Sequence, residues 1–378
     1  MKDSNLSLIF RLICEKEIIS RAELKNITKL SAATVSYLTD ELIEKGYVYE
    51  VGAGEKKTSG RKPILLRVNK TGGCFASVEI LSSEMIAAFY DLELNQIAYE
   101  KKRLQNVGGL GTEVSAFVKE CVRKHEIYFK LLAVSLGISG IIDRATGEVV
   151  SSTTLELDGE DTLLREVKNA FPGLPVHLQD DSSLVAYAQK EFSEFSGSGT
   201  LISVDIGEGV GAGIIVDGKI FEGANGMAGE FGHISVDCNG ALCKCGGRGC
   251  LETMVSIPAI LGRMKEKEGL KQLSWKEAVE GVKSGNSLGL EVVREAARRL
   301  AYGLNNLINL IDPQAIIISG EITALEDAFM QPLTQTLNQM VLLADKRSLQ
   351  VQYSKITGNA VTLGGARYAL DSLIGGEG

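Results

Sequence analysis

The pattern of apolar and polar positions changes character near residue 70. Before that point, apolar residues recur at helical spacing in three short segments, at residues 5–14, 20–30 and 31–46. Two strand-like segments around a Gly- and Lys-rich stretch follow, within residues 47–68. Beyond residue 70, short apolar runs typical of buried strands alternate with longer amphipathic segments typical of helices. The chain therefore predicts a small helical domain followed by a larger α/β body.

The first domain, residues 1–70, carries the signals of a helix-turn-helix. Ser20 is a predicted N-cap, and Glu23 three residues later completes a capping box. Ser31 is a second N-cap, and the helix after it ends at Gly46. The short connection between these two helices is typical of a helix-turn-helix. The two strands that follow predict a wing, so the domain is expected to be a winged helix-turn-helix.

Side chains suited to DNA gather at the start of the third helix and in the wing. Small residues at the helix start would let the backbone approach base edges, while hydroxyl and cationic groups would contact phosphates. The predicted DNA-binding residues are Ser31, Ala32, Ala33, Thr34, Ser36, Tyr37, Lys56, Lys57, Arg61 and Lys62. The alternative is a small helical protein-interaction domain whose lysines are merely solvated.

Charge is distributed unevenly along the chain. Residues 1–70 carry 13 Lys and Arg against 9 Asp and Glu, whereas the remainder carries 27 against 39, for a net charge of −8. This distribution predicts that only the basic N-terminal domain, residues 1–70, binds a polyanion.

Length and composition indicate a globular protein of several domains. The 378 residues exceed what one compact core accommodates, and no apolar run approaches the roughly 18 residues of a membrane span. The charged N-terminal segment is unlike a signal peptide. The cysteine count of seven is odd, and the dispersed Cys14, Cys74 and Cys121 favour buried free thiols. We therefore expect a protein of the reducing cytoplasm that makes no membrane contact.

The body repeats one order of elements. Three consecutive strands are predicted at residues 74–81, 84–92 and 96–104, followed by a helix and the buried strand 131–140. Three further strands begin near residue 200, and later strands are separated by long helices. Two such units in tandem are typical of the actin/hexokinase duplication, whose two lobes close around a cleft. The expected fold class is α/β, with a winged helix-turn-helix head and a two-lobed actin/hexokinase-like (ribonuclease H-like) body.

Three motifs follow one another in the second half of the chain. They are the glycine-rich hairpin DIGEGVGAGIIVDG (205–218), GEFGHI (229–234) and CKCGGRGCLE (243–252). The hairpin glycines would let the backbone approach a phosphate or a sugar, although a tight turn without a ligand explains a lone glycine run equally well. With these motifs in this order, residues 72–378 resemble the ROK family of sugar kinases and sugar-responsive repressors.

The resemblance implies how the body divides. The first lobe is expected to span residues 71–190 and to be completed by a C-terminal helix at 362–378. The second lobe, which contains the cysteine-rich loop, is expected to span residues 191–361.

The cysteine-rich loop has the spacing of a metal site. His233, Cys243, Cys245 and Cys250 read as His-x9-Cys-x-Cys-x4-Cys, with glycines between them that allow tight turns. One imidazole and three thiolates form the closed tetrahedral shell of a structural zinc. Free thiols in a glycine-rich loop are the alternative. The same site carries zinc in the ROK family, so the resemblance implies zinc here. Cys238 has no assigned role.

The metal loop also predicts one wall of a sugar site. Metal ligation of His233 would fix its ring and leave its second nitrogen to face a ligand. Carboxylates accept hydrogen bonds from pairs of sugar hydroxyls, so Glu230, His233 and Glu252 are predicted to bind sugar.

The resemblance places the opposite wall at LQDDSS (178–183). Asp181 matches the catalytic aspartate, which acts as general base in phosphoryl transfer. Asp180 replaces an Asn of the family, and its carboxylate can only accept hydrogen bonds. Acidic residues at a solvated helix N-terminus are the alternative interpretation. Gly140 and Thr153 fall in loops that touch sugar in the family and are further predicted contacts.

The first lobe departs from the family at residues 79–84. The family's kinases carry an Asp-x-Gly-Gly-Thr turn that holds ATP phosphates, whereas this chain has EILSSE, with Glu79 in place of the Asp and no glycine. Without glycines the turn cannot offer the same cradle of N–H groups, and Glu84 would repel a triphosphate. We therefore expect no ATP binding, and only a vestigial catalytic role for Asp181.

The leading hypothesis is a sugar-responsive, DNA-binding transcriptional regulator of the repressor type, whose lobes close on a carbohydrate. Its expected partners are operator DNA, a sugar or sugar-derivative effector and further copies of the chain, in a dimer or a dimer of dimers, because helix-turn-helix heads read paired half-sites. The alternative is an ATP-dependent kinase of a hexose or N-acetylhexosamine with an added DNA-binding head. The altered first-lobe turn opposes it, since phosphoryl transfer depends on positioning and charge neutralisation.

Overall fold

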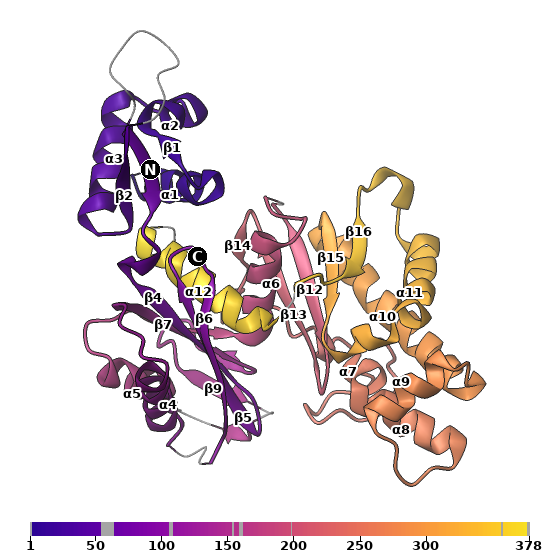
Figure 1. Ribbon diagram of the computed structural model, residues 1–378. Helices are drawn as coiled ribbons and strands as arrows, with labels where there is room; N and C mark the ends of the chain where they lie inside the picture. The colour runs from indigo at the N-terminus through magenta and orange to yellow at the C-terminus, as the bar shows by residue number, and fades with distance from the viewer. Residues whose placement is uncertain are drawn as a thin grey trace. The chain divides into compact units, whose positions relative to one another are not determined.

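The chain divides into two compact units. One comprises Met1–Leu184 together with Val361–Gly378, and the other comprises Val185–Ala360. Figure 1 shows the elements of both units in a computed structural model. The structure describes residues 2–53, 64–105, 109–152, 155–158, 162–197, 199–356 and 358–375. The domain boundaries predicted at residues 70 and 190 stay predictions.

The first unit begins with a small head of three helices and a three-stranded sheet. The helices are α1 (Lys2–Lys16), α2 (Arg21–Thr28) and α3 (Ala32–Glu44), and the sheet order is β1-β3-β2, with β1 (Ile19–Ser20), β2 (Val48–Ala53) and β3 (Ile64–Val68). The predicted capping box is present, because Ser20 Oγ accepts a hydrogen bond from the Glu23 N–H at 3.2 Å and Glu23 Oε2 accepts one from the Ser20 N–H at 3.0 Å. The two-residue β1 was not predicted.

The core of the head continues into the rest of the first unit. One buried cluster joins head residues such as Ile9 and Leu38 to Phe75 at the start of the large sheet and to Leu370 and Ile374 of the C-terminal helix α12 (Ala360–Ile374). A shared apolar core of this kind ties the head to α12 by burial, which favours a fixed contact between them.

The large sheet of the first unit has the order β11-β7-β4-β5-β6. Its strands are β4 (Cys74–Ile80), β5 (Glu84–Asp91), β6 (Gln96–Arg103), β7 (Leu131–Ile138) and β11 (Val176–Asp180). Strands β4, β5 and β6 run antiparallel in sequence order, whereas β7 and β11 extend the sheet in parallel on the other side of β4.

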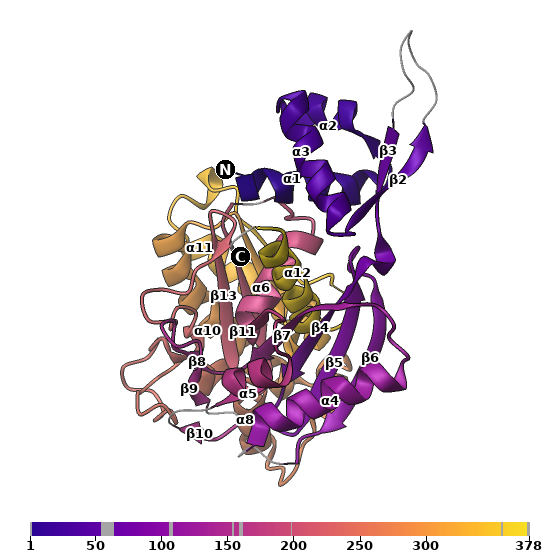
Figure 2. The ribbon, with the colours of Figure 1, turned by 90° about the vertical axis from the view of Figure 1, so that its left-hand side faces the viewer.

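Side chains of successive residues on β4 point to opposite faces of this sheet, as the strand period of two requires. Ala76 and Val78 pack on the side of α4 (Leu110–Lys124) and α5 (Leu163–Ala170). Phe75 packs on the side of α12. Figures 1 and 2 show these helices on the two faces of the sheet.

The second unit repeats the same strand order. Its sheet reads β14-β13-β12-β15-β16, with β12 (Leu201–Ile206), β13 (Val210–Val216), β14 (Lys219–Ile220), β15 (Ala315–Ser319) and β16 (Gln350–Tyr353). Numbered within each unit, both sheets have the order 3-2-1-4-5, with an antiparallel meander on one side and parallel strands on the other. The duplicated α/β body predicted from the sequence is confirmed.

Helices pack on one face of the second sheet. They are α7 (Glu252–Val255), α8 (Ile257–Glu268), α9 (Trp275–Lys283), α10 (Ser287–Ile311) and α11 (Asp327–Met340), and α6 (Asp181–Phe192) contains the division between the units. The long α10 starts at an Asn286 cap, whose side chain accepts hydrogen bonds from the N–H groups of Leu288 and Gly289. Buried residues of α10 and α11 pack with those of β12 and β15 in one core.

The remaining elements are short. A second three-stranded sheet has the order β10-β9-β8, with β8 (Ile141–Ile142), β9 (Val149–Ser152) and β10 (Leu157–Asp158). Short 3-10 helices lie at Lys70–Gly72, Phe231–His233, Glu321–Leu325 and Ala344–Lys346. Within the described ranges, every helix is too short or too polar to cross a bilayer.

Candidate functional site

The start of α3 presents small side chains to solvent, as the DNA-binding hypothesis requires. Ala32 and Ala33 are exposed, and Tyr37 keeps 58% of its surface accessible. Ser31 caps the helix, because its Oγ accepts a hydrogen bond from the Thr34 N–H at 3.1 Å and lies 2.8 Å from the Thr34 hydroxyl. The side chains of Ser31 and Thr34 therefore take part in capping the N-terminus of α3.

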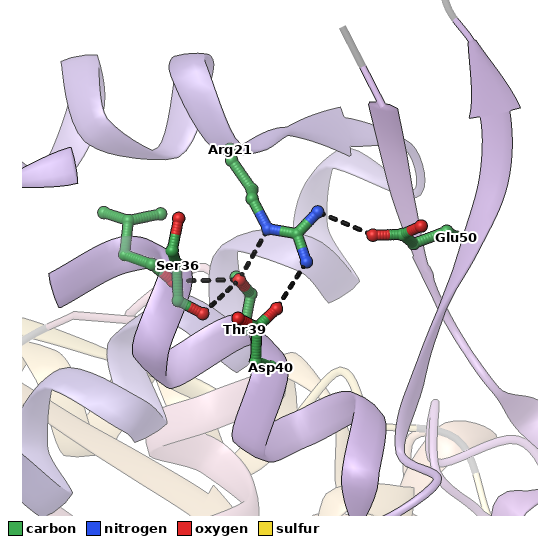
Figure 3. A network of polar contacts seen from close by, with 6 residues as sticks. Arg21, Ser36, Thr39, Asp40 and Glu50 are labelled. Atoms are coloured by element: carbon green, nitrogen blue, oxygen red, sulfur yellow. Dashed lines mark hydrogen bonds and ion pairs between the residues drawn. The ribbon is translucent and has the colours of Figure 1, made fainter. Parts of the chain in front are cut away.

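One arginine links α3 to the neighbouring elements of the head. Arg21, the first residue of α2, donates from Nε to the buried Thr39 hydroxyl at 2.9 Å and from Nη2 to Asp40 at 2.7 Å. Its Nη1 donates to Glu50 of β2, also at 2.7 Å. Figure 3 shows the guanidinium between α3 and β2, with the Ser36 carbonyl also accepting from Thr39. This network fixes α3 relative to the base of the wing, and sequence analysis missed it.

Four of the predicted DNA-binding residues lie in the wing tip, residues 54–63. These residues, Lys56, Lys57, Arg61 and Lys62, fall outside the described part of the chain. Their assignment stays a prediction.

The four predicted metal ligands converge. The nearest donor atoms of His233, Cys243, Cys245 and Cys250 all lie within 4.8 Å of one another. His233 Nδ1 lies 3.7 Å from Cys243 Sγ, and the sulfurs of Cys245 and Cys250 are 3.6 Å apart. Tetrahedral ligands with metal–sulfur bonds of about 2.3 Å are about 3.8 Å apart, so the spacing suits a four-coordinate metal.

The loop that carries the cysteines is folded by short backbone contacts. The Cys243 N–H donates to the Gly247 carbonyl at 2.8 Å, and the Gly246 N–H donates to the Cys243 carbonyl at 2.9 Å. Gly249 has φ +65°, and a Cβ there would lie 1.7 Å from the Asp237 carbonyl oxygen. Glycine is therefore required at this position, both for its conformation and for the close approach. Cys238 is exposed and is not part of the cluster.

The two ring nitrogens of His233 have different neighbours, and the predicted contact of the second nitrogen with a ligand stays a prediction. Nδ1 points to the cysteines, while Nε2 lies 3.9 Å from Glu230 Oε2. The Glu230 side chain is 46% exposed. Desolvation by the surrounding protein raises its pKa, the Glu252 carboxylate adds to the rise, and His233 opposes it. Glu230 thus interacts both with His233, one of the predicted metal ligands, and with the Glu252 carboxylate.

Glu252 has a second role that the sequence did not reveal. It is the first residue of α7, and its Oε2 accepts a hydrogen bond from the Val210 N–H at 3.2 Å, just after the glycine-rich turn. Its other oxygen lies 3.4 Å from Lys244 Nζ. A Cβ at Gly209 would lie 3.0 Å from Glu252 Oε2. The glycine therefore leaves room for this carboxylate to hold the turn.

Asp205, in the same hairpin, is a further carboxyl group and is partly buried. Ser319 Oγ donates to its Oδ1 at 2.8 Å. Burial raises the pKa of Asp205, and the hydrogen bond from Ser319 opposes the rise. The motif was predicted, but Asp205 was not among the site residues.

Asp180 and Asp181 lie at the carboxyl end of β11, in the first unit. Asp180 Oδ2 accepts a hydrogen bond from the Ser183 N–H at 2.9 Å, and Asp181 Oδ1 accepts one from the Ser182 N–H at 2.7 Å. Both carboxylates thus stabilise the start of α6, which supports the alternative interpretation of a helix N-terminus. Both remain partly exposed, so this role leaves their sugar-binding assignment a prediction.

Gly140 lies at the same edge of the sheet. It follows β7, which pairs in parallel with β11 so that Ile138 is opposite Asp180. A Cβ at Gly140 would lie 2.7 Å from the Ser151 carbonyl oxygen, so close packing explains this glycine. Thr153, the other loop residue, falls outside the described ranges. The sugar-site predictions thus divide into one group in each unit.

Comparison with known proteins identifies the family. Residues 76–372 match the ROK family. The chain belongs to this family. It is 30% identical over 381 residues to a xylose repressor of Caldicellulosiruptor bescii, with 96% of this chain and 94% of that protein covered.

Solved ROK structures share the fold. A ROK family transcriptional regulator, a homologue of the E. coli Mlc protein, superposes with a TM-score of 0.88 at 24% identity, covering 100% of this chain and 97% of that one. A ROK glucokinase from Streptomyces griseus, solved with glucose and AMPPNP, gives a TM-score of 0.68 at 25% identity over 78% of this chain and 98% of its own. The predicted fold class, a winged helix-turn-helix head on a two-lobed body, is confirmed.

The first-lobe turn of this ROK chain is a tight hairpin without glycine. The Leu81 N–H donates to the Glu84 carbonyl at 2.9 Å, and Ser82 and Ser83 are exposed. The predicted repulsion by Glu84 needs correction, because its carboxylate pairs with Lys101 Nζ at 3.0 Å. The missing glycines, and not an unpaired charge, distinguish this turn.

Burial favours the neutral thiol form of the three dispersed cysteines. Cys74 and Cys121 are buried and Cys14 is partly buried, and none of the three forms a disulfide. Burial raises the pKa of Cys14 and Cys74 to about 12 and that of Cys121 to about 11. A thiol with so high a pKa carries almost no thiolate at neutral pH.

Proposed function

We propose that this ROK protein is a sugar-responsive transcriptional repressor. The observation that carries the proposal is the likeness along the whole chain, head included, to a xylose repressor. The ROK glucokinase covers 78% of the chain, while the Mlc-like regulator covers all of it. The extra length corresponds to a DNA-binding head with small, exposed residues at the start of α3.

The head would read operator DNA through α3. Ala32 and Ala33 allow close approach of the helix start to base edges, and the Arg21 network keeps α3 in register with β2 of the wing. Two heads from two copies of the chain would contact paired half-sites, so the functional unit is a dimer or a dimer of dimers.

A structural zinc would hold the loop of the second unit. His233, Cys243, Cys245 and Cys250 would hold the ion, which would anchor the loop and take no part in chemistry because four protein ligands would occupy it. The loop in turn presents His233 Nε2 and Glu230 to a sugar, while Glu252 both holds the glycine-rich turn and accepts hydroxyl hydrogen bonds. Asp180, Asp181, Gly140 and Thr153, all in the first unit, are the other proposed sugar contacts.

Sugar would act by preferring one of two states of the protein. A difference of about 1–3 kcal/mol in sugar affinity between the states changes DNA affinity about 5- to 150-fold. The buried cluster shared by the head and α12 offers a rigid route within the first unit.

A sugar kinase is the second candidate. Asp181 and the glycine-rich hairpin favour it, as does the fold shared with the glucokinase. The first-lobe turn opposes it, because a glycine-free hairpin with two exposed serines offers no close cradle of N–H groups to a triphosphate. We therefore place regulation ahead of catalysis.

The proposal is tested by DNA affinity measured with and without sugar. A duplex is selected from random DNA by the full chain, and its dissociation constant is measured by fluorescence anisotropy at fixed salt, with D-xylose, D-glucose and N-acetylglucosamine in turn. One sugar is expected to change the affinity at least about fivefold. Specific DNA binding that none of the sugars alters would contradict the proposal that a sugar controls the protein. Failure to select any duplex would contradict the proposal that the protein is a DNA-binding repressor.

A paired substitution tests the role of α3. Ala33→Glu places a carboxylate against DNA phosphates, and a negative charge in the first turn of a helix does not harm folding. It should weaken DNA binding at least about tenfold. Gln272→Glu adds the same charge at an exposed site in the second unit and should leave the affinity unchanged. Equal effects of the two substitutions would show that α3 does not read DNA.

A further inference from the structure

A cavity of about 330 Å³ lies on the second unit, between α8 and α10. Six charged side chains line it: Arg263, Lys267, Arg294, Arg298, Glu291 and Glu295. The buried Val292 forms an apolar part of its wall. A volume of this size suits a small metabolite.

The two carboxylates of the cavity are already neutralised. Glu291 pairs with Lys267 at 2.8 Å. Glu295 accepts a hydrogen bond from Arg299 Nε at 2.7 Å, and Arg299 also lies 3.7 Å from Asp237. Neither carboxylate is therefore left to balance the remaining arginines.

Three guanidinium groups stay without a partner. Arg263, Arg294 and Arg298 form no ion pair or hydrogen bond with any side chain in the part of the chain that the structure describes. On a protein of net charge −8, three such groups around one cavity form a local excess of positive charge. Such a concentration attracts anions and discriminates against cations.

The helices set the geometry of the cavity. Arg263 and Lys267 are four residues apart on α8, and Arg294 and Arg298 are four apart on α10, so each pair lies on one helix face. The cavity brings these two faces together. Guanidinium groups present several N–H donors in a plane and bind phosphate oxygens in pairs, which favours phosphate over a simple monovalent anion.

We propose that this cavity binds a small phosphate-bearing ligand, whose phosphoryl oxygens accept hydrogen bonds from Arg263, Arg294 and Arg298. The ligand class includes inorganic phosphates and phosphate monoesters of small metabolites. The site uses none of the residues proposed for the sugar effector or for DNA. The cavity is linked to the metal loop through Arg299, which pairs with Glu295 of the cavity wall and also with Asp237. The Asp237 carbonyl in turn packs against Gly249 of the metal loop.

Calorimetric titration of the full chain tests the site. The probes are inorganic phosphate, pyrophosphate and glucose 6-phosphate, each at constant pH and ionic strength. Pyrophosphate or the phosphate ester is expected to bind with one site per chain. The double variant Arg294→Gln/Arg298→Gln should bind the same probe at least about tenfold more weakly, because hydrogen bonds to charged groups are lost. Tighter binding of glucose 6-phosphate assigns the site to an organic phosphate, and tighter binding of pyrophosphate to an inorganic one.

A matched variant separates the site from general charge effects. Lys271→Gln/Lys276→Gln removes the same two charges from exposed positions of the second unit outside the cavity, and it should bind the probe within twofold of the natural chain. Circular dichroism checks that both variants fold. Where the arginine double variant loses helix content, Arg263→Gln from α8 takes its place.

Three results would overturn the proposal. The first is the absence of saturable binding of every phosphate probe to the natural chain. The second is an equal loss of affinity in the arginine and lysine variants. The third is loss of affinity for duplex DNA in the arginine variant while phosphate binding is unchanged, which would assign these arginines to nucleic acid.

Discussion

The turn between β4 and β5 and the turn between β12 and β13 occupy the same place in the two repeats and have opposite chemistry. The second-lobe turn, Gly207–Gly209, lies against Glu252, which accepts a hydrogen bond from the Val210 N–H. The first-lobe turn, Leu81–Ser83, has two exposed serines and closes through a backbone hydrogen bond to the Glu84 carbonyl.

The difference separates two uses of glycine. In the second lobe, a Cβ at Gly209 would lie 3.0 Å from Glu252 Oε2, so a larger side chain there would push this carboxylate away from the turn. In the first lobe the Ser82 and Ser83 side chains are exposed, and the Ser83 carbonyl accepts a hydrogen bond from the Leu104 N–H at 3.0 Å, so the turn is held through its backbone. We expect the absence of glycine from the first-lobe turn to deprive it of a phosphate cradle, while the strand order of the two sheets stays the same.

The largest expected effect is removal of the proposed metal, because Glu252, which follows the cysteine-rich loop, accepts a hydrogen bond from the second-lobe turn. Cys250→Ser, or chelation, should destabilise the second unit by about 3 kcal/mol or more, since the ligands are then held by the chain alone. Trp275 is the single tryptophan and lies on α9, so its fluorescence during urea unfolding reports this unit.

The control for the metal is Cys238→Ser, which changes an exposed cysteine outside the cluster. It should keep both the metal, measured by mass spectrometry, and the unfolding midpoint. An unchanged midpoint in Cys250→Ser would show that the second-lobe turn does not depend on the metal loop.

The first unit should instead be sensitive to acid, through His177 of β11. Burial lowers the pKa of this imidazole to about 4, and Lys168 adds to the shift. The unfolded chain takes up the proton near pH 6.5 and the folded chain only near pH 4, so stability is present above pH 6.5 and is lost as pH falls toward 4. The loss is about 2–3 kcal/mol. His177→Leu should flatten this slope in urea unfolding followed by circular dichroism, and an unaltered slope would exclude His177 as its source.

Equivalent substitutions in the two turns test the comparison itself. Gly209→Val should cost about 1–3 kcal/mol, because the Val210 N–H loses its partner and Glu252 is displaced. Ser83→Val, at the same position of the first-lobe turn, should stay within about 0.5 kcal/mol of the natural chain, since its side chain is exposed. Urea unfolding measures both. Similar costs at both positions would refute the distinction between the turns.

The smallest expected effect comes from the ion pair beside the first-lobe turn. Glu84→Gln breaks the partly exposed pair with Lys101 and should change the free energy of unfolding by less than about 0.5 kcal/mol. Restored ATP binding in this variant would show that the Glu84 charge, and not the missing glycines, excludes the nucleotide.

Much of the fold could be predicted because its strands are long and buried. The central strands of the two large sheets, β4, β5, β7, β12, β13 and β15, bury nearly continuous runs of residues, and this pattern is visible in the sequence. The strands β1, β8, β10 and β14 have two residues each, too few to produce a pattern. Their pairing depends on tertiary contacts.

The metal ligands could be predicted because histidine and cysteine are scarce and their spacing is characteristic. The Arg21 network could not, since it joins residues 18 to 29 positions apart and a lone arginine has no characteristic spacing. The hydrogen bond from the Val210 N–H to Glu252 leaves no trace in the sequence either, because its donor is backbone. The sequence shows that the arginines of the cavity lie four residues apart, the spacing of one helix face. It does not show that α8 and α10 pack against each other, which the structure reveals.

The most direct test of the account is a calorimetric comparison of sugar and nucleotide binding to the same protein. The full chain is titrated with D-xylose, D-glucose and N-acetylglucosamine, and separately with Mg-ATP in the absence and presence of whichever sugar binds. The account predicts saturable binding of one sugar, no saturable binding of Mg-ATP and no phosphorylated product. Saturable Mg-ATP binding with turnover of the bound sugar would contradict it.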